Sequence, residues 1–321
     1  MAQAKGRSKL VTAAAAMMLV MAAGSEAATA GETKAQISFQ GKDFSIHVMN
    51  EDGSGHRTLV PDDSAAFGDD EQATPSWTSD GRMVAFGRRV DHSPGDGFNE
   101  GDSNLWVMDA DGSDPRQLTD DPSDETSPTW SPAGTRIAFS RWSGDTNESR
   151  RADLVVIDAD GSDERVLPDR FAQAREADWS PTGGRIAFVG ARVSDAQSGY
   201  DYDIFTVKPD GSGLKRLTRC GGCLDPSWSP DGRRIAYQRG VDVSRIWMMR
   251  ADGSKKGLVP TKHSKNGDWS LFDPAWSPDG KRIAFGDATD GGLCLSIYNL
   301  RTRKERLVFG DDAADPAWRR R

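Results

Sequence analysis

Short apolar runs alternate with turn-forming residues along most of this chain. The clearest case is DPSWSPDGRRIAY at residues 225–237, where SPDG separates an apolar segment around Trp228 from the run IAY. Proline sets φ at the second turn position, aspartate can bond its own backbone, and glycine accepts the left-handed conformation. The phrase therefore predicts a strand, a tight turn and a second strand. The run IAY is apolar on both faces, which is typical of a strand between two other sheets.

The same phrase returns at a regular spacing. Full copies occupy residues 74–86, 127–139, 176–188 and 273–285, and a truncated copy, DPAW, lies at the end of the chain. The tryptophans of these copies are 42 to 53 residues apart, at Trp77, Trp130, Trp179, Trp228, Trp276 and Trp318. A repeat of this length with four short strand signals predicts the blade of a β-propeller.

Each unit is expected to contain four strands, here called a to d from the propeller axis outward. Strand a is the P-x-W segment, strand b is the IAF-type run, and strand d is a short segment such as RLT. Strand c is a second apolar run, at 45–50, 105–110, 154–159, 204–209, 245–250 and 295–300. The first unit begins with strand b near Ile37 and lacks strand a, while 315–318 is an orphan strand a. We expect these two segments to pair, which gives one all-β, six-bladed propeller over residues 31–321, closed by both termini.

The N-terminal segment has the pattern of a secretory signal. Lys5, Arg7 and Lys9 precede an uncharged apolar run of 14 residues from Leu10 to Ala23, which is short for a membrane-spanning helix. Ala28-Thr29-Ala30 fits a cleavage site, and Ser25-Glu26-Ala27 is a second candidate. We predict a cleaved signal peptide at 1–30, no membrane span, and a protein exported to the periplasm, cell envelope or medium. An uncleaved anchor is the alternative.

The charge balance narrows the classes of partner. The formal net charge is −8, and removal of three basic residues and Glu26 with the signal takes it to −10. Such a charge argues against nucleic acid and anionic membrane surfaces as partners.

The repeated phrase resembles a known family. WSPDG-x-x-IAF, followed by a strand ending in MDADGS and then by RLT, is similar to the WD40-like propeller repeat of the TolB type, over roughly 37–318. The resemblance implies a six-bladed propeller in an exported bacterial protein. TolB proteins carry an α/β domain before the propeller, which binds envelope partners. Few residues separate the signal from the first strand here, so we expect that domain to be lacking. The propellers of prolyl oligopeptidases look similar but accompany a hydrolase domain.

The sequence contains no familiar catalytic motif. It lacks G-x-S-x-G, H-E-x-x-H and a phosphate-binding glycine loop. The four histidines (His47, His56, His92 and His263) fall on separate elements of the strand map, which argues against a histidine metal site. In the DADGSD segments at 109–114 and 158–163, glycine directly follows the second aspartate, which favours a hairpin turn over a calcium loop. We therefore expect no catalytic residues, no metal and no cofactor.

Cysteine usage suggests one local cross-link. Cys220 and Cys223 flank two glycines in the predicted d–a connection, and an oxidising compartment favours a disulfide between them. Free thiols, or a metal or redox pair, are the alternatives. Cys294 lies between two leucines and is expected to be a buried thiol.

Two groups of residues are candidates for binding. The long b–c and d–a connections are expected on one face and carry aromatic residues, among them Trp142, Tyr200, Tyr202 and Trp269. Such rings form contact hot spots on variable loops, or alternatively fold back to anchor their own loops. The residues directly before strand a should ring the channel mouth on this face: Thr74, Ser127, Glu176, Asp225, Asp273 and Asp315. Their carboxylates could hold a cation or a basic group of a partner, or could bond the N–H groups of their own loops.

These observations favour a non-catalytic, exported propeller that binds a protein or peptide through its loop-rich face. The alternative is a propeller that binds a glycan or small ligand, with a lyase or hydrolase site at the channel mouth. A closed propeller does not require further copies of itself, so a monomer is expected.

Overall fold

Strands and tight turns make up the described part of the computed structural model, and no α-helix is present there. The described residues are 34–41, 45–60, 74–89, 103–144, 151–167, 171–193, 200–240, 243–262, 270–289, 292–310 and 313–319. The predicted signal at 1–30 lies outside these ranges. Within them, no helix has the length and apolarity needed to cross a bilayer. The description below concerns the compact unit Ala35–Arg321.

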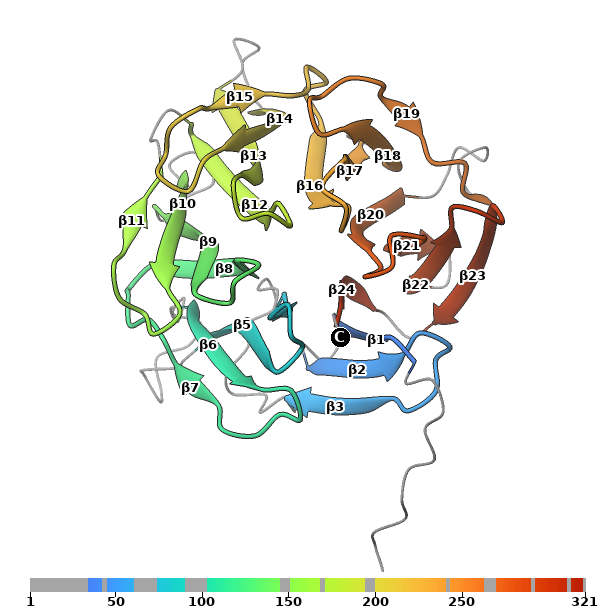
Figure 1. Ribbon diagram of the computed structural model, residues 1–321, viewed down its shortest axis with the longest axis horizontal. Helices are drawn as coiled ribbons and strands as arrows, with labels where there is room; N and C mark the ends of the chain where they lie inside the picture. The colour runs from blue at the N-terminus through green and yellow to red at the C-terminus, as the bar shows by residue number, and fades with distance from the viewer. Residues whose placement is uncertain are drawn as a thin grey trace, which may run out of the picture. The chain divides into compact units, whose positions relative to one another are not determined.

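The strands of this unit form five sheets arranged around a common centre (Figure 1). The first sheet has the order β24-β1-β2-β3, with β1 at Gln36–Gln40, β2 at Ile46–Asn50, β3 at Arg57–Val60 and β24 at Ala314–Trp318. The second has the order β4-β5-β6-β7, with β4 at Ser76–Trp77, β5 at Met83–Arg89, β6 at Ser103–Asp109 and β7 at Arg116–Gln117.

The third sheet has eight strands, because β12 pairs with β10 in parallel at Gln173 and Ala152 and joins two four-stranded units. Its strands are β8 at Asp124–Trp130, β9 at Arg136–Ser143, β10 at Arg151–Asp158, β11 at Arg165–Val166, β12 at Gln173–Trp179, β13 at Ile186–Val193, β14 at Tyr200–Val207 and β15 at Lys215–Arg216.

The last two sheets run in chain order. One contains β16 at Cys223–Trp228, β17 at Arg234–Arg239, β18 at Arg245–Arg250 and β19 at Gly257–Leu258. The other contains β20 at Ser270–Trp276, β21 at Arg282–Thr289, β22 at Gly292–Asn299 and β23 at Lys304–Phe309.

The two ends of the unit meet in the first sheet. β24 pairs antiparallel with β1, with Ile37 opposite Trp318 and Ser38 opposite Ala317. The N–H of Arg319 also donates to the carbonyl of Gln36 at 2.9 Å. Segments 280 residues apart in sequence therefore share one ladder, which Figure 1 shows as blue β1 beside red β24.

The a–b and c–d turns lie together on one face, called here the turn face. The N–H groups of Ala110, Ala159 and Ala251, in c–d turns, donate to the carbonyls of Arg82, Thr135 and Arg233, in a–b turns. In strand a the residues found around the channel lie three residues before the repeated tryptophan, which precedes the a–b turn, so they lie part-way along the strand and away from the turn face.

Apolar strands fill the space between neighbouring sheets. One cluster joins Ile46 and Val48 of β2 to Trp77 of β4 and Phe86 of β5, and a second joins Ile246 of β18 to residues of β20 and β21. Arginines cover several of the repeated tryptophans: the guanidinium carbon of Arg234 lies 4.6 Å from the ring centre of Trp276. Most of the repeated phrase is thus scaffold, with tryptophan and the IAF run buried between blades.

Candidate functional site

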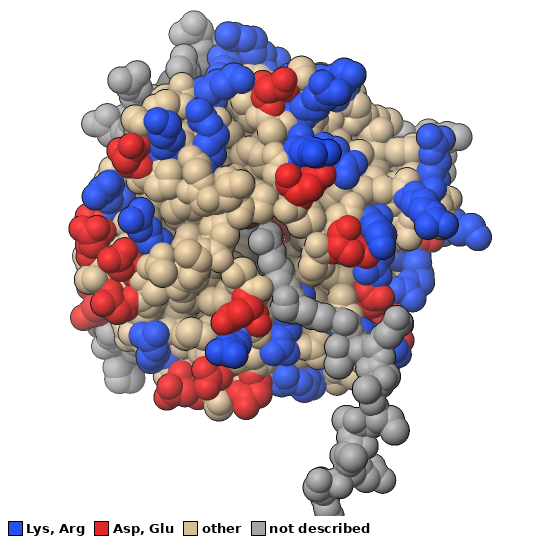
Figure 2. Space-filling view, viewed as in Figure 1, with Lys and Arg blue, Asp and Glu red and all other residues tan. Residues whose placement is uncertain are grey.

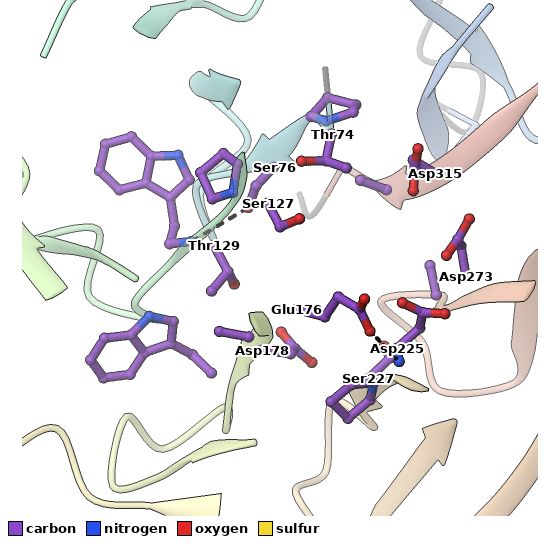
Figure 3. Close-up of a pocket in the computed structure, with 18 of the residues that line it drawn as sticks. Thr74, Ser76, Ser127, Thr129, Glu176, Asp178, Asp225, Ser227, Asp273 and Asp315 are labelled. Carbon is purple, nitrogen blue, oxygen red and sulfur yellow. Dashed lines mark hydrogen bonds between the residues drawn. The ribbon is translucent and has the colours of Figure 1, made fainter. Parts of the chain in front are cut away.

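The six residues predicted to ring the channel do line one cavity. It has a volume of about 430 Å³ and runs along the a strands, lined among others by Thr74, Ser127, Glu176, Asp225, Asp273 and Asp315. In Figure 3 the carboxylates of Glu176, Asp225, Asp273 and Asp315 lie along one side of the cavity, and Thr74 and Ser127 lie on the other. We call the four carboxylates the acidic ring.

A backbone irregularity positions the ring residues. The sequence placed them directly before strand a, which is wrong for all but Thr74: the other five lie inside strand a, where the register to strand b shifts. All five have φ between 48° and 53°, although none is glycine. A residue in this left-handed region interrupts the pairing as a β-bulge does. The bulge lets the side chain of the ring residue project towards the channel. In a regular strand, the alternation of side chains would point a neighbouring residue there instead.

Hydrogen bonds tie the ring together between adjacent sheets. The N–H of Asp225 donates to Oε2 of Glu176 at 3.0 Å, and the N–H of Glu176 donates to Oγ of Ser140 at 3.2 Å. The Asp273 carboxyl is in hydrogen-bond contact with those of Asp225 and Asp315. The ring is therefore a connected group of acids. Only one of these hydrogen bonds, from Asp225 to Glu176, joins a backbone N–H to a ring carboxylate.

Three acids of the ring, Asp225, Asp273 and Asp315, hold protons more tightly than isolated aspartates do. Burial raises the pKa of Asp225 well above its ordinary range, and the charges of Glu176 and Asp273 raise it further. The pKa of Asp273 is also raised by burial, and then by the charges of Asp315 and Glu176. For Asp315, burial and the charge of Asp225 raise the pKa to about 7. Near neutral pH the ring therefore shares protons among its carboxylates.

A single positive charge faces the ring. Among the described residues that line the cavity, Arg175 is the only lysine or arginine, against the five acids Glu176, Asp178, Asp225, Asp273 and Asp315. Arg175 forms an ion pair with Glu176. Burial alone would lower the pKa of Arg175, but the charges of Glu176 and Asp225 outweigh it and raise the pKa. The lining of the cavity therefore has more carboxyl groups than cations, and near neutral pH bound protons compensate part of the difference.

Two of the predicted aromatic residues hold this arginine. The guanidinium carbon of Arg175 lies 4.9 Å from the ring centre of Tyr202 and 5.8 Å from that of Trp142. Both rings are anchored at their polar ends: Trp142 Nε1 donates to Oγ1 of Thr126 at 3.0 Å, and the Tyr202 hydroxyl donates to Oε1 of Gln173 at 3.2 Å. Trp142 and Tyr202 thus position Arg175 beside the acidic ring, and Trp142 also lines the cavity.

The prediction that these aromatics lie on long connections was wrong. Trp142 lies on β9, Tyr200 and Tyr202 on β14, because the β9–β10 and β13–β14 ladders continue to Ser143 opposite Arg151 and Val193 opposite Tyr200. Backbone pairing extends these hairpins although their ends lack regular apolar alternation. Trp269 lies outside the described residues.

The predicted cysteine pair is joined by a disulfide in the structure, and Cys294 is buried and outside that disulfide. Oδ1 of Asp203 accepts the N–H of Cys220 at 2.8 Å and the hydroxyl of Thr218 at 2.7 Å. Asp203 is 1% exposed and also pairs with Arg216. The donor atoms of Asp203 and the two cysteines lie within 4.8 Å of one another. The two sulfurs are bonded to each other and the carboxylate is already hydrogen-bonded, so the group has a structural role. We call the disulfide-closed segment 220–223 the strap.

Two histidines that the strand map separated are in contact. His56 Nε2 lies 3.2 Å from His47 Nδ1, and both rings pack against Phe39. The sequence gave no sign of this pair, because the contact is diagonal across β2 and β3 and depends on their register.

Comparisons with known proteins agree with this architecture. A family model described as the TolB beta propeller domain matches residues 96–270, more than half of the chain. The chain belongs to this family. The resemblance inferred from WSPDG-x-x-IAF and the expected all-β class are thereby confirmed. No curated protein sequence matches this TolB-family chain.

Solved structures with the same fold come from proteins of different kinds. TolB from Acinetobacter baumannii is 16% identical, with a TM-score of 0.67 over 91% of this chain and 68% of that one. A chain of a nidogen/laminin complex is 13% identical, with a TM-score of 0.63 over 89% and 98%. Oligogalacturonate lyase in complex with manganese is 16% identical, with a TM-score of 0.51 over 86% and 72%. At these identities the likeness shows the fold alone.

Proposed function

We propose that this TolB-family chain is an exported, non-catalytic six-bladed propeller, closed by β24 on β1, that binds a protein or peptide at the end of the channel remote from the turn face. The observation that carries the proposal is the excess of carboxylates over Arg175 in the cavity. The six repeated tryptophans and the shared β24-β1 ladder support the blade count and its closure. The segment at 1–30 supports export.

The ring suits a basic group of the partner, such as a lysine side chain or an N-terminal amine. A low-dielectric cavity lined by one sign of charge concentrates its field at the opening and attracts the opposite charge. Burial, and then repulsion between the acids, raises the pKa values of Asp225, Asp273 and Asp315. An ammonium group bound among them would supply a compensating positive charge and release protons.

A small ligand or glycan is the second candidate, and the size of the cavity favours it. A volume of about 430 Å³ falls in the range of small-molecule sites, roughly 300–1,000 Å³. Thr74 and Ser127, which carry hydroxyl groups, lie across the cavity from the carboxylates, as Figure 3 shows. In this case a protonated ring carboxyl would be the candidate general acid of a lyase or hydrolase.

Peptide binding to ring variants tests the proposal. The purified chain without residues 1–30 would be titrated with a labelled peptide that begins with Lys-Lys, and with the same peptide fully acetylated on its amines. We expect binding of the free-amine peptide only, and at least about tenfold weaker binding to Asp273→Asn/Asp315→Asn, since one lost charge contact is worth about 1.4 kcal/mol or more. Asp160→Asn is the matched control, because Asp160 lies in a c–d turn and bonds Ser162.

Two outcomes would overturn the leading proposal. Equal binding of the acetylated peptide would show that the amines are not recognised. The small-ligand candidate would be favoured instead if the peptide does not bind and an acidic or neutral oligosaccharide raises the melting temperature. That rise should be lost in the ring double variant.

Export is tested separately: the mature protein from cells that carry the natural leader is expected to begin at Gly31.

A further inference from the structure

A second recess lies on the turn face, in the unit whose strand a carries Asp225. It has a volume of about 850 Å³ and is lined by the ends of β17, β18 and β19 and their turns. Its lining includes Arg233, Arg234, Arg250 and Lys255, with Met248 and Leu258 as apolar members. We call these six residues the basic groove. In Figure 2, lysines and arginines gather over this sector of the turn face, near β15, β18 and β19 of Figure 1.

The recess carries four basic side chains against two acids, Asp231 and Asp252, which compensate only part of the positive charge. Among the described residues, no ion pair involves Arg233, Arg250 or Lys255, all of which are exposed. The two acids that line the recess beside the basic groove are hydrogen-bonded within their own turns. Asp231 Oδ1 accepts the Ser229 hydroxyl at 2.6 Å, and Asp252 Oδ1 accepts the N–H of Ser254 at 2.8 Å.

The charges at the ends of strands b and c differ between units of the repeat, and the fourth unit also carries two basic residues there, Arg185 and Lys208, next to the Ile186–Val207 pair. At the end of strands b and c in the third sheet, Arg136 lies opposite Asp158, and the pair is 3.6 Å apart. The equivalent positions of β17 and β18 are Arg234 and Arg250, two like charges directly opposite each other. Like charges in this position destabilise a sheet. The same scaffold accommodates the opposite charge elsewhere, so the second arginine is not required for folding.

The geometry points to the basic groove as a docking site for a short acidic peptide segment of a partner. Guanidinium groups hold carboxylates through paired hydrogen bonds, and Arg233 and Arg250 supply two exposed guanidinium groups at the groove, while that of Arg234 packs on Trp276. Leu258, which is 41% exposed, and Met248 form an apolar surface. An apolar side chain next to the acidic residue of the peptide can pack on this surface. Extended polyanions are disfavoured, because the net charge of −8 repels them while a short segment meets only the local field. This inference is independent of the function proposed for the acidic ring.

Fluorescence anisotropy with a labelled Glu-Leu-Glu-Leu-Glu peptide and the full chain tests the groove. We expect saturable binding that weakens as salt rises, and at least about a tenfold loss of affinity in Arg250→Asp. That variant recreates the Arg136–Asp158 arrangement, so its melting temperature should stay level or rise, and lost binding cannot be attributed to unfolding. Arg136→Gln, on the same face in another sector, should bind as the natural chain does.

The outcomes that overturn the inference are specific. One is an affinity unchanged by Arg250→Asp, and another is no binding of the peptide at millimolar concentration. A third is binding of heparin or of phosphatidylglycerol vesicles without binding of the peptide, which would assign the groove to a different class of partner.

Discussion

The backbone N–H of Asp225 donates a hydrogen bond to the side chain of Glu176 at 3.0 Å, across two neighbouring sheets. Both residues occupy the same bulge position in successive units, with φ of 48° and 53°. One acid of the ring therefore fixes the backbone that presents the next. The same bulges concentrate negative charge in one cavity, and this concentration leads to the first two predictions.

Removing a charge from the ring should stabilise the protein above neutral pH. The pKa of Asp315 is about 7 in the folded chain and about 4 in an unfolded one. The folded state thus binds more protons between these values, and the free energy of unfolding falls as pH rises from about 4 to about 7. Asp315→Asn removes this loss. We expect it to raise the free energy of unfolding at pH 8 by about 1–3 kcal/mol, since a pKa unit is about 1.4 kcal/mol and partial exposure reduces the full value.

Urea denaturation of both proteins at pH 5 and pH 8 measures this difference. At pH 5 the natural carboxyl is already protonated, so the two proteins should be nearly equal in stability. A variant that is less stable than the natural chain at pH 8 would show that the carboxylate of Asp315 is needed as a hydrogen-bond acceptor instead.

Loss of Arg175 should have the opposite effect and lower the free energy of unfolding. Its guanidinium is sandwiched near Tyr202 and Trp142 and pairs with Glu176. Arg175→Gln leaves a partly buried carboxylate without its cation, so we expect the free energy of unfolding at pH 8 to fall by about 2–4 kcal/mol. Part of this loss should be recovered at pH 5, where the raised pKa values of Asp225, Asp273 and Asp315 leave these three acids protonated.

A surface arginine provides the comparison for Arg175. Arg82 pairs with Asp80 at 3.7 Å in an exposed a–b turn, and Arg82→Gln should change the free energy of unfolding by less than about 1 kcal/mol. Equal effects of the two substitutions would mean that the environment of Arg175 is effectively aqueous.

At one position of the repeat, close contact with a neighbouring unit requires glycine, in addition to the backbone conformation. Gly161 has a φ of 91°, and a Cβ there would lie 2.7 Å from the carbonyl oxygen of Leu118 on the preceding unit. Gly134 also has a positive φ, of 67°, but a Cβ there would meet nothing within 4 Å. We expect Gly134→Ala to cost about 1 kcal/mol of conformational strain and Gly161→Ala to cost at least about 2 kcal/mol. Thermal unfolding of both variants compares them, and equal costs would mean that the turn at Gly161 moves freely.

Local chemistry made much of this fold predictable from sequence. The SPDG turn is determined by proline and glycine within four residues, and the IAF run by its own apolarity, so strands b, the turns and the ring positions could be placed by aligning the copies. Pairing of residues 37–40 with the DPAW segment could be inferred from the unit that lacks strand a. The left-handed bulge could not be inferred, since aspartate and glutamate before proline or alanine normally predict extended backbone.

Features that depend on register were not predictable. Asp203 stands in an apolar strand and gave only a weak signal, and its contact with Cys220 comes from the packing of the strap on β14. Trp142 and Tyr202 were assigned to loops, because no pattern marks where a hairpin ladder ends. By contrast, the change from acidic to basic residues at the ends of the c strands can be seen in the sequence. The aligned residues are Asp109, Asp158, Lys208 and Arg250. Only the structure shows that Arg250 faces another arginine.

The final prediction concerns the strand that joins the two ends of the unit. Trp318 of β24 is 6% exposed, packs with Ile37 and Phe39, and lies under the guanidinium of Arg282 at 5.3 Å. Trp318→Ala removes a large side chain from the contact between β24 and β1, and we expect the free energy of unfolding to fall by about 3–5 kcal/mol. Leu307→Ala is the control, since Leu307 is 58% exposed on β23, and should change stability by less than about 0.5 kcal/mol. If β24 holds the ring closed, hydrogen exchange in the Trp318→Ala variant should rise first at Ile37–Gln40, and a uniform rise throughout the unit would count against closure at this seam.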